Sequence, residues 1–214
     1  MNVGNTSGDV FVGRQREMAE LKAALEDTLS GRGQLVMLAG EPGIGKTRTA
    51  RELASYTETL DVRVLWGWCY EQEGAPPYWP WVQVLRSFVQ QLDPDQLRVQ
   101  MGAGAADIAE AVPVVREKLP GLEPPPALEP EQARFRLFDS ITAFLKNAAL
   151  AQPLVIVLDD LHWADRSSLL LLAFIARELG DSRLLLVGTY RDVEVSRRHP
   201  LSQTFGNLMR EQLF

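Results

Sequence analysis

The stretch QLVMLAGEPGIGKT, Gln34–Thr47, joins a short apolar run to a glycine-rich turn. Residues 34–39 are mostly apolar and have glycine on both sides, which predicts a strand buried on both faces. The turn after this run matches G-x-x-x-x-G-K-[ST], the pattern of a phosphate-binding loop. A helix is expected next, over Thr47–Tyr56. Strand, loop and helix together predict an α/β domain built on a parallel sheet.

Each part of the Gly40–Thr47 turn suits the binding of a phosphate chain. Its glycines allow backbone conformations in which successive N–H groups face phosphate oxygens. Lys46 offers a mobile charge for the β- and γ-phosphates, and the Thr47 hydroxyl is a hard oxygen ligand suited to Mg²⁺. The following helix turns its positive N-terminal end to the same anion. The alternative, a chance glycine turn, is disfavoured by the position between a buried strand and a helix.

Apolar strands and amphipathic helices alternate along the rest of the chain. Further strands are predicted at Val62–Trp68, Leu154–Leu158 and Leu184–Gly188. Helices are predicted around Met18, Leu21, Leu25 and Leu29, over Trp81–Leu92, Glu131–Asn147 and Ser167–Leu179, and from Pro200 onward. This alternation indicates a parallel sheet covered on both faces, in which ligands bind outside the carboxyl ends of the strands. The chemistry is therefore expected in the turns after residues 39, 158 and 188.

The whole chain, 1–214, is interpreted as one domain that starts with a polar segment at 1–9. A proline-heavy stretch, Pro113–Pro130, ends in EPPPALEP. Proline lacks the backbone donor and resists both helix and sheet, so this stretch is predicted to be a surface excursion and not a domain boundary.

Two adjacent carboxylates end the apolar run LVIVLDD, Leu154–Asp160. Carboxylates beside a dry sheet are costly unless they have a task. Asp159 is well placed to hold Mg²⁺ through its waters, and Asp160 to orient or deprotonate an attacking water. The alternative is that one aspartate caps the following turn.

A third strand ends in LVGTYRD, Leu186–Asp192. Thr189 and Arg191 are suited to sensing a γ-phosphate, with Arg191 supplying the charge. From spacing alone, an ion pair between Arg191 and a nearby acid, Asp192 or Glu194, is equally consistent with the sequence.

Other conspicuous residues favour structural roles. The aromatic cluster is expected to pack in the core and not to stack on bases, because no basic residues interleave with it; it comprises Trp66, Trp68, Tyr70, Tyr78, Trp79 and Trp81. His162 is expected to be a structural hydrogen-bonder, although its closeness to Asp159 keeps a catalytic role open. Cys69 is interpreted as a small buried hydrophobe.

Composition narrows the class of protein. The 214 residues contain 22 Lys and Arg against 28 Asp and Glu, a formal charge of −6, whereas modules that grip nucleic acid usually carry a basic excess. No apolar run approaches the ~18 residues needed to span a bilayer, and the amino terminus lacks a signal-peptide pattern. The single cysteine cannot form an internal disulfide. We expect a cytoplasmic protein that contacts neither a membrane nor, through this segment, nucleic acid.

Several strings together resemble one family. FVGR at Phe11–Arg14, GEPGIGKT at Gly40–Thr47, WPW at Trp79–Trp81, LDDLHWAD at Leu158–Asp165 and GTYRD at Gly188–Asp192 occur in the order typical of the ATPase domain of STAND-type bacterial regulators. These are relatives of the AAA+ ATPases that include LuxR-type transcriptional activators and proteins with adenylate-cyclase domains. The phosphate loop is shared by many families, whereas LDDLHWAD is far more specific.

The resemblance implies a P-loop NTPase fold of the ASCE type, a three-layer sandwich in which the fourth and fifth strands flank the first. It implies that Arg191 reads the γ-phosphate. It also implies a set of residues around ATP or ADP, with Thr47 and Asp159 holding Mg²⁺ and Lys46, Asp160 and Arg191 catalytic: Val12, Gly13, Arg14, Gly40, Glu41, Pro42, Gly43, Ile44, Gly45, Lys46, Thr47 and Arg48.

The family continues beyond the last residues of this chain with a fifth strand, a helical lid and a winged-helix region, so we expect a fragment of a larger protein. Other domains of that protein, and nucleotide-dependent self-association, are the expected partners. Because Asp160 stands where many relatives have glutamate, slow ATP hydrolysis in a regulatory switch is predicted. The alternative function is a scaffold that binds ADP or ATP without hydrolysing it.

Overall fold

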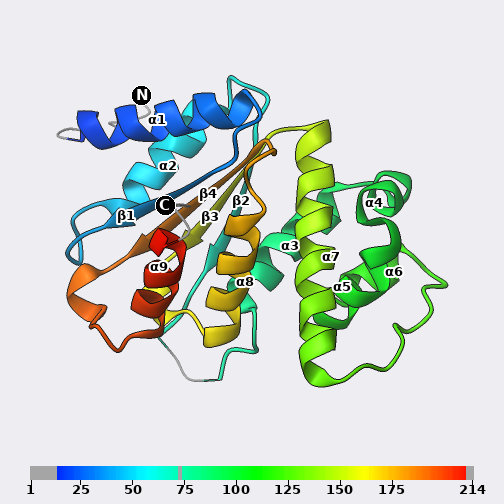
Figure 1. Cartoon of the computed structure of the whole chain (residues 1–214). Coiled ribbons are helices and arrows are strands. Elements are labelled where there is room, and N and C mark those ends of the chain that lie inside the picture. The colour runs from blue at the N-terminus through cyan, green and yellow to red at the C-terminus, as the bar shows by residue number, and fades with distance from the viewer. Residues whose placement is uncertain (1–13, 72–73, 211–214) are drawn as a thin grey trace, which may run out of the picture.

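A parallel sheet lies at the centre of the computed structural model, which describes residues 14–71 and 74–210. In this part of the chain the strand order is β1-β4-β3-β2 (Figure 1). The strands are β1 (Gln34–Ala39), β2 (Arg63–Trp68), β3 (Leu154–Asp159) and β4 (Leu184–Tyr190). β1 pairs along its whole length with β4, from Gln34 with Leu185 to Ala39 with Tyr190. The expected neighbourhood of the first and fourth strands is therefore confirmed.

Helices cover both faces of the sheet, as expected for a three-layer α/β sandwich (Figure 1). One face carries α1 (Gln15–Leu29) and α2 (Lys46–Thr57). The other carries α3 (Trp79–Gln91), α7 (Pro130–Ala151) and α8 (Arg166–Arg177), with α9 (Pro200–Arg210) packed beside α8.

The strands are mostly apolar because they contribute to both layers. Along β3, Val155 and Val157 join the cluster under α1 and α2. Their neighbours Leu154, Ile156 and Leu158 join the cluster under α3, α7 and α8. Successive side chains of a strand point to opposite faces, so a strand covered on both sides has few polar positions away from its ends. All six residues of β3 are buried, including Asp159 at its end.

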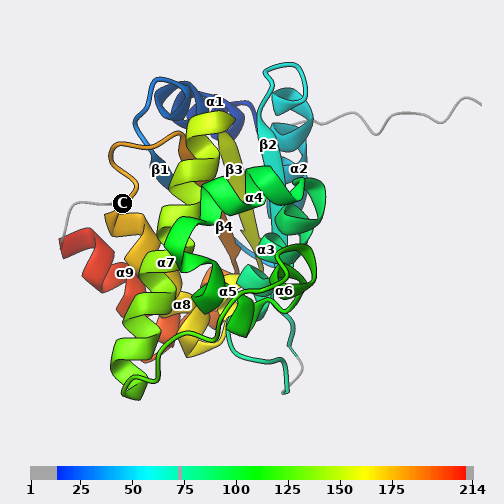
Figure 2. The ribbon, with the colours of Figure 1, turned by 90° about the vertical axis from the view of Figure 1, so that its right-hand side faces the viewer.

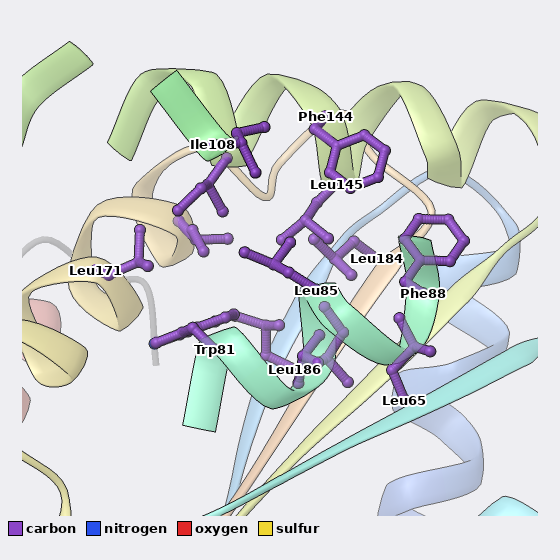
Figure 3. Packing of buried hydrophobic residues seen from close by; sticks show 14 of the residues in the cluster. Leu65, Trp81, Leu85, Phe88, Ile108, Phe144, Leu145, Leu171, Leu184 and Leu186 are labelled. Carbon is purple, nitrogen blue, oxygen red and sulfur yellow. The ribbon is translucent and has the colours of Figure 1, made fainter. Parts of the chain in front are cut away.

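The larger core lies between the sheet and the helices α3, α7 and α8 (Figure 3). Trp81 is fully buried there, and its indole Nε1 donates to the Ser168 carbonyl at 3.0 Å. The rings of Phe88 and Phe144 stack with their centroids 5.3 Å apart. This packing holds α3 against α7 and α8, and with them the loops at the carboxyl edge of the sheet.

A group of short helices packs against α7 (Figure 2). It comprises α4 (Pro94–Met101), the turn Gly102–Gly104, α5 (Ala105–Ala111) and α6 (Val114–Lys118). The prediction of an irregular excursion over Pro113–Pro130 is therefore wrong for its first part, where Val115 and Leu119 are buried. Proline is tolerated at the start of a helix, where its missing N–H has no partner to lose. From Pro120 to Glu129 the chain is irregular and mostly exposed.

The aromatic cluster does not behave as one unit. Trp81 is in the core, but Trp68 is 40% exposed and Tyr70 is 54% exposed, so core packing is wrong for these two. The rings of Trp66 and Trp68 stack on the same side of β2, with centroids 6.0 Å apart. β2 is an outer strand of the described sheet, so its side chains are covered less completely than those of β3.

Element bounds differ from the predictions by a few residues. α7 extends to Ala151 and β4 to Tyr190, whereas α8 ends at Arg177 with Glu178 as its C-cap, so the expected cap at Gly180 is wrong. Within residues 14–71 and 74–210, no helix is both long and apolar enough to cross a bilayer.

Candidate functional site

The loop between β1 and α2 forms the base of the site. Gly43 and Gly45 have φ values of 74° and 95°, a left-handed region that favours glycine. A Cβ at either position would meet nothing within 4 Å, so backbone conformation and not crowding requires glycine there. Gly45 is the N-cap of α2 and has no side chain to satisfy the first N–H groups of the helix. These groups are suited to binding an anion.

Lys46 lies across this loop. Its Nζ donates to the carbonyl oxygens of Gly40 at 2.8 Å and Glu41 at 2.9 Å. The residue is only 6% exposed, and burial lowers the pKa of its ammonium, an effect that the carboxylate of Asp160 opposes and Arg191 reinforces. The hydrogen bonds of the Lys46 ammonium go to neutral carbonyl oxygens, which neutralise its positive charge poorly. This favours the binding of a phosphate group at Lys46.

The side chains of Thr47 and Asp159 meet at the carboxyl edge of the sheet. Thr47 Oγ1 lies 3.0 Å from Oδ1 and 3.1 Å from Oδ2 of Asp159. The hydroxyl of Thr189, at the end of β4, donates to Oδ1 of Asp159 at 2.6 Å. Two strand ends and a helix start thus gather hard oxygen atoms in one place. Thr189 was expected to face a γ-phosphate, but in this structure it orients Asp159.

Asp160 has an unusual backbone. Its φ of 59° and ψ of 46° lie in the left-handed region, which aspartate tolerates better than most residues. Its N–H donates to Thr189 Oγ1 at 2.9 Å, so one hydroxyl fixes both aspartates. The turn leaves the Asp160 side chain 35% exposed, in contrast to the buried Asp159. One carboxylate is therefore fixed and enclosed, and its neighbour is accessible to water.

Arg191 follows β4 and pairs with Glu194. Its Nη1 donates to Glu194 Oε1 at 2.8 Å, one of the ion pairs that the spacing allowed. This hydrogen bond raises the pKa of the guanidinium, and Asp160 adds to the effect. Both Lys46 and Asp160 are within electrostatic range of Arg191.

The other predicted contact residues are spread around the loop. Arg14 Nη2 donates to the Ile44 carbonyl at 2.7 Å, which ties the start of the described chain to the phosphate loop. Val12 and Gly13 lie outside the described residues. Ile44 is half exposed at the loop tip, next to the exposed Glu41, Pro42 and Gly43. Arg48 lies in the first turn of α2, 4.0 Å from the Glu52 carboxylate.

His162 and Cys69 are both buried near Asp160. The expectation that His162 is a structural hydrogen-bonder is wrong, because neither ring nitrogen has a hydrogen-bond partner among the described residues. Burial lowers its pKa, against the raising effect of Asp160 and Glu194. The prediction for Cys69 is confirmed: it is 7% exposed, and burial raises the pKa of its thiol.

The donor set fits a hydrated Mg²⁺ ion better than a metal caged by protein. Within residues 14–71 and 74–210, no three His, Cys, Asp or Glu side chains gather as a metal cluster. Thr47 and Asp159 offer a hydroxyl and one carboxylate side by side. Mg²⁺ characteristically takes one or two carboxylates, keeps several waters and completes its shell with substrate phosphates. These two residues are therefore the ones that would hold it.

Comparison with known proteins shows the family of this chain. The profile of the AAA ATPase domain family matches residues 10–187. The chain belongs to this family. An uncharacterised protein of Rhizobium meliloti (strain 1021) is 26% identical over 202 residues, a match covering 86% of this chain and 19% of that protein. A STAND protein (signal transduction ATPase with numerous domains) with a tetratricopeptide repeat sensor from Pyrococcus horikoshii matches with a TM-score of 0.44 and 17% identity.

The latter match covers 89% of this chain and 22% of the other, so the AAA ATPase domain described here spans about a fifth of the length of each relative. Family membership supports a nucleotide-binding ATPase domain, which accounts for the phosphate loop and the adjacent oxygen cluster.

Several of the residues predicted from the sequence lie together in this AAA ATPase domain, but some contacts between them were not predicted. The link from Thr189 to Asp159 joins two strand ends and depends on their register. Spacing indicates Glu194 only as a partner of Arg191, whereas its second oxygen lies 3.6 Å from His162 Nε2. In the sequence, this proximity could have been predicted from the two acidic residues that follow GTYR, together with the histidine that follows the neighbouring strand.

Proposed function

We propose that this AAA ATPase domain binds ATP with Mg²⁺ and hydrolyses it slowly, as a nucleotide-controlled switch in a larger regulatory protein. The contact between Thr47 Oγ1 and both carboxylate oxygens of Asp159 carries the proposal. It brings a residue of the phosphate loop and one at the end of a distant strand within reach of a single cation.

Each residue has a distinct role in this proposal. Lys46 exchanges the carbonyls of Gly40 and Glu41 for the β- and γ-phosphate oxygens. Bound Mg²⁺ supplies charge neutralisation for those oxygens. Asp160 orients and deprotonates the attacking water, and Arg191 turns from Glu194 to the γ-phosphate.

Slow turnover follows from the short side chain at position 160. Aspartate reaches one methylene less far than glutamate, so its carboxylate is held farther from a water beside the phosphate. Arg191 must also leave an ion pair with Glu194 before it can contact the γ-phosphate. We expect turnover below ~10 s⁻¹, the typical value for enzymes.

We assign the chain to the STAND class of AAA ATPases. The string LDDLHWAD at Leu158–Asp165, together with the phosphate loop and GTYRD, supports this assignment. In this proposal the other domains of the protein sense the signal and carry the output, and nucleotide exchange biases their arrangement in the cytoplasm.

A direct test is calorimetric titration of the chain with ATP, GTP and ADP, with and without Mg²⁺, followed by single-turnover phosphate release. Lys46→Ala should weaken ATP binding at least about tenfold, the effect of losing a charged contact worth ~1.4 kcal/mol or more. Lys146→Ala is the matched control, because Lys146 Nζ also donates to a backbone carbonyl, that of Glu178, away from the loop. Equal affinities for both variants and the parent would refute the binding proposal.

The second candidate is a scaffold that retains ADP or ATP without hydrolysis. The ion pair of Arg191 with Glu194 favours it, since this pair holds the arginine on protein and off phosphate. Asp160→Asn separates the two candidates. If the variant and the parent release phosphate equally while both bind ATP, the scaffold function stands and the hydrolase function does not.

A further inference from the structure

His162 lies between two carboxylates. Its imidazole is fully buried, with Nδ1 3.9 Å from Oδ1 of Asp160 and Nε2 3.6 Å from Oε2 of Glu194. Both distances exceed that of a normal N–H···O hydrogen bond, and neither nitrogen has a partner among the described residues. A buried polar atom without a partner is unfavourable, so the ring gains by shifting toward either carboxylate.

Glu194 connects His162 to the arginine. Its Oε1 accepts from Arg191 at 2.8 Å, and its other oxygen faces His162. Four side chains thus lie in a row: Arg191, Glu194, His162 and Asp160. Arg191 and Glu194 are hydrogen-bonded, whereas the other two contacts in the row are longer than a hydrogen bond. The row connects the residue proposed to sense the γ-phosphate with the residue proposed to position water.

A neutral imidazole can donate a hydrogen bond to only one of these two carboxylates at a time. It carries one N–H donor and one acceptor nitrogen, whereas both neighbours are acceptors when ionised. Burial lowers the pKa of His162 and so favours the neutral ring, although Asp160 and Glu194 oppose this effect. The N–H is therefore either on Nδ1, facing Asp160, or on Nε2, facing Glu194.

We propose that His162 is a positioning residue whose N–H alternates between Asp160 and Glu194, so that the contact made by Arg191 controls the freedom of Asp160. This inference rests on the proposed function. While Arg191 occupies Glu194, a small shift of the ring closes the 3.9 Å gap, so that the Nδ1–H of His162 donates to Asp160 and restrains its carboxylate. When Arg191 turns to the γ-phosphate, Glu194 loses its donor and takes the Nε2–H.

Proton balance is maintained in this exchange. The proton on Nδ1 passes to the Asp160 carboxylate, which is 35% exposed and releases it to water. Nε2 receives a proton that enters from water through the Glu194 carboxylate, which is 30% exposed, so the ring stays neutral and no charge is gained or lost. Asp160, no longer bound by Nδ1–H, is then free to accept from the attacking water. The chain thereby withholds its general base until a γ-phosphate is present.

The tautomer of His162 can be observed directly. The chain has two histidines, so a ¹⁵N-histidine spectrum contains two imidazoles, and His199→Asn assigns them. His199 Nδ1 accepts from the Leu201 N–H at the start of α9, a cap that asparagine preserves. With Mg²⁺ and ADP we expect His162 to be protonated on Nδ1, and with Mg²⁺ and a non-hydrolysable ATP analogue on Nε2. The same tautomer with both nucleotides would overturn the inference.

Two variants of similar size give an independent kinetic test. Asparagine carries its amide near the position of Nδ1, so His162→Asn should hold Asp160 permanently and lower turnover by about tenfold, part of the effect of a general base. Glutamine reaches toward the position of Nε2 and leaves Asp160 free, so His162→Gln should lower turnover clearly less than His162→Asn does. ATP affinity should be unchanged in both. Equal loss of turnover in both variants, the result of a merely structural role, would contradict the inference.

Failure of the inference can be told apart from failure of the proposed function. If the parent binds neither ATP nor its analogue, both are overturned. If the parent binds and hydrolyses ATP while the tautomer does not change, only the role of His162 is overturned. If the parent binds ATP without hydrolysing it, the inference about His162 is decided by its tautomer alone, compared between the ADP complex and the complex with the ATP analogue.

Discussion

The hydroxyl of Thr47 lies 3.0 Å and 3.1 Å from the two carboxylate oxygens of Asp159, a residue 112 positions later in the chain. One follows β1 and the other ends β3, two strands that β4 separates in the sheet. The contact therefore exists only when all three strands are in register. It makes the proposed cation site a sensitive reporter of the native fold.

Removal of the Thr47 hydroxyl should abolish the benefit of Mg²⁺. We expect Thr47→Ala to bind ATP with about the same affinity with and without Mg²⁺, because a direct oxygen ligand is lost. Thr47→Ser keeps the hydroxyl and should keep the Mg²⁺ dependence. Isothermal titration of both variants in Mg²⁺ and in EDTA measures the difference. A persistent Mg²⁺ effect in the alanine variant would assign the cation to other residues.

The hydroxyl of Thr189 should contribute to stability as well as to the site. Thr189→Val removes the donor to Asp159, in a buried hydrogen bond, and the acceptor for the Asp160 N–H, in a partly buried one. The unfolding free energy should fall by ~1–3 kcal/mol, the cost of unsatisfied buried polar groups. Thr142→Val is the control, since buried Thr142 only donates back to the Phe138 carbonyl four residues earlier in its helix. Urea unfolding of both variants should show a clearly larger loss for Thr189→Val.

Burial of His162 predicts a loss of stability in mild acid. Its pKa is lowered in the folded chain, so below the ordinary value of ~6.5 the unfolded chain binds more protons than the folded one. The stabilisation that the neutral ring contributes is therefore fully present above pH ~6.5. It is lost as the pH falls toward the pKa of His162 in the folded chain, by at most ~1.4 kcal/mol per pH unit. His162→Phe should have a shallower dependence between pH 7 and 5.5 in urea unfolding. An identical slope in parent and variant would contradict this assignment.

Two glycine substitutions should act in opposite directions. A Cβ at Gly67 in β2 would lie 2.2 Å from the Pro80 carbonyl oxygen, so Gly67→Ala forces β2 and α3 apart and should cost ~1–3 kcal/mol or more. A Cβ at Gly206 in α9 meets nothing within 4 Å, and Gly206→Ala should gain up to ~1 kcal/mol from reduced backbone entropy. Thermal unfolding of the two variants tests both signs. Equal changes in unfolding free energy for the two variants would mean that β2 and α3 do not pack as closely at Gly67 as the structure shows.

Much of the fold could be predicted from the sequence because its strands are buried on both faces. Runs such as Leu154–Leu158 are apolar without a break, and the phosphate-loop pattern specifies the turn and the helix after β1. The short helices α4, α5 and α6 were missed because each is brief, and because α4 and α5 pack on α7 while α6 packs on α5 and α3. Such tertiary support has no local signature.

The candidate site was predicted residue by residue but not contact by contact. Lys46, Thr47 and Asp159 lie together as their motifs indicated. The roles of His162 and Glu194 depend on distances across the carboxyl edge of the sheet, between turns that follow different strands. Spacing along the chain cannot specify such distances. For the same reason, it could not decide whether Arg191 pairs with an acid in the structure.

The left-handed backbone of Asp160 limits how the proposed hydrolysis could be accelerated by substitution. Replacing Asp160 with glutamate would extend the reach of the carboxylate, but glutamate adopts a φ of 59° less readily than aspartate does. A longer acid at this position would thus come with a strained turn at the carboxyl edge of the sheet. Substitutions that relax the turn at Asp160 should therefore precede any exchange of Asp160 for glutamate.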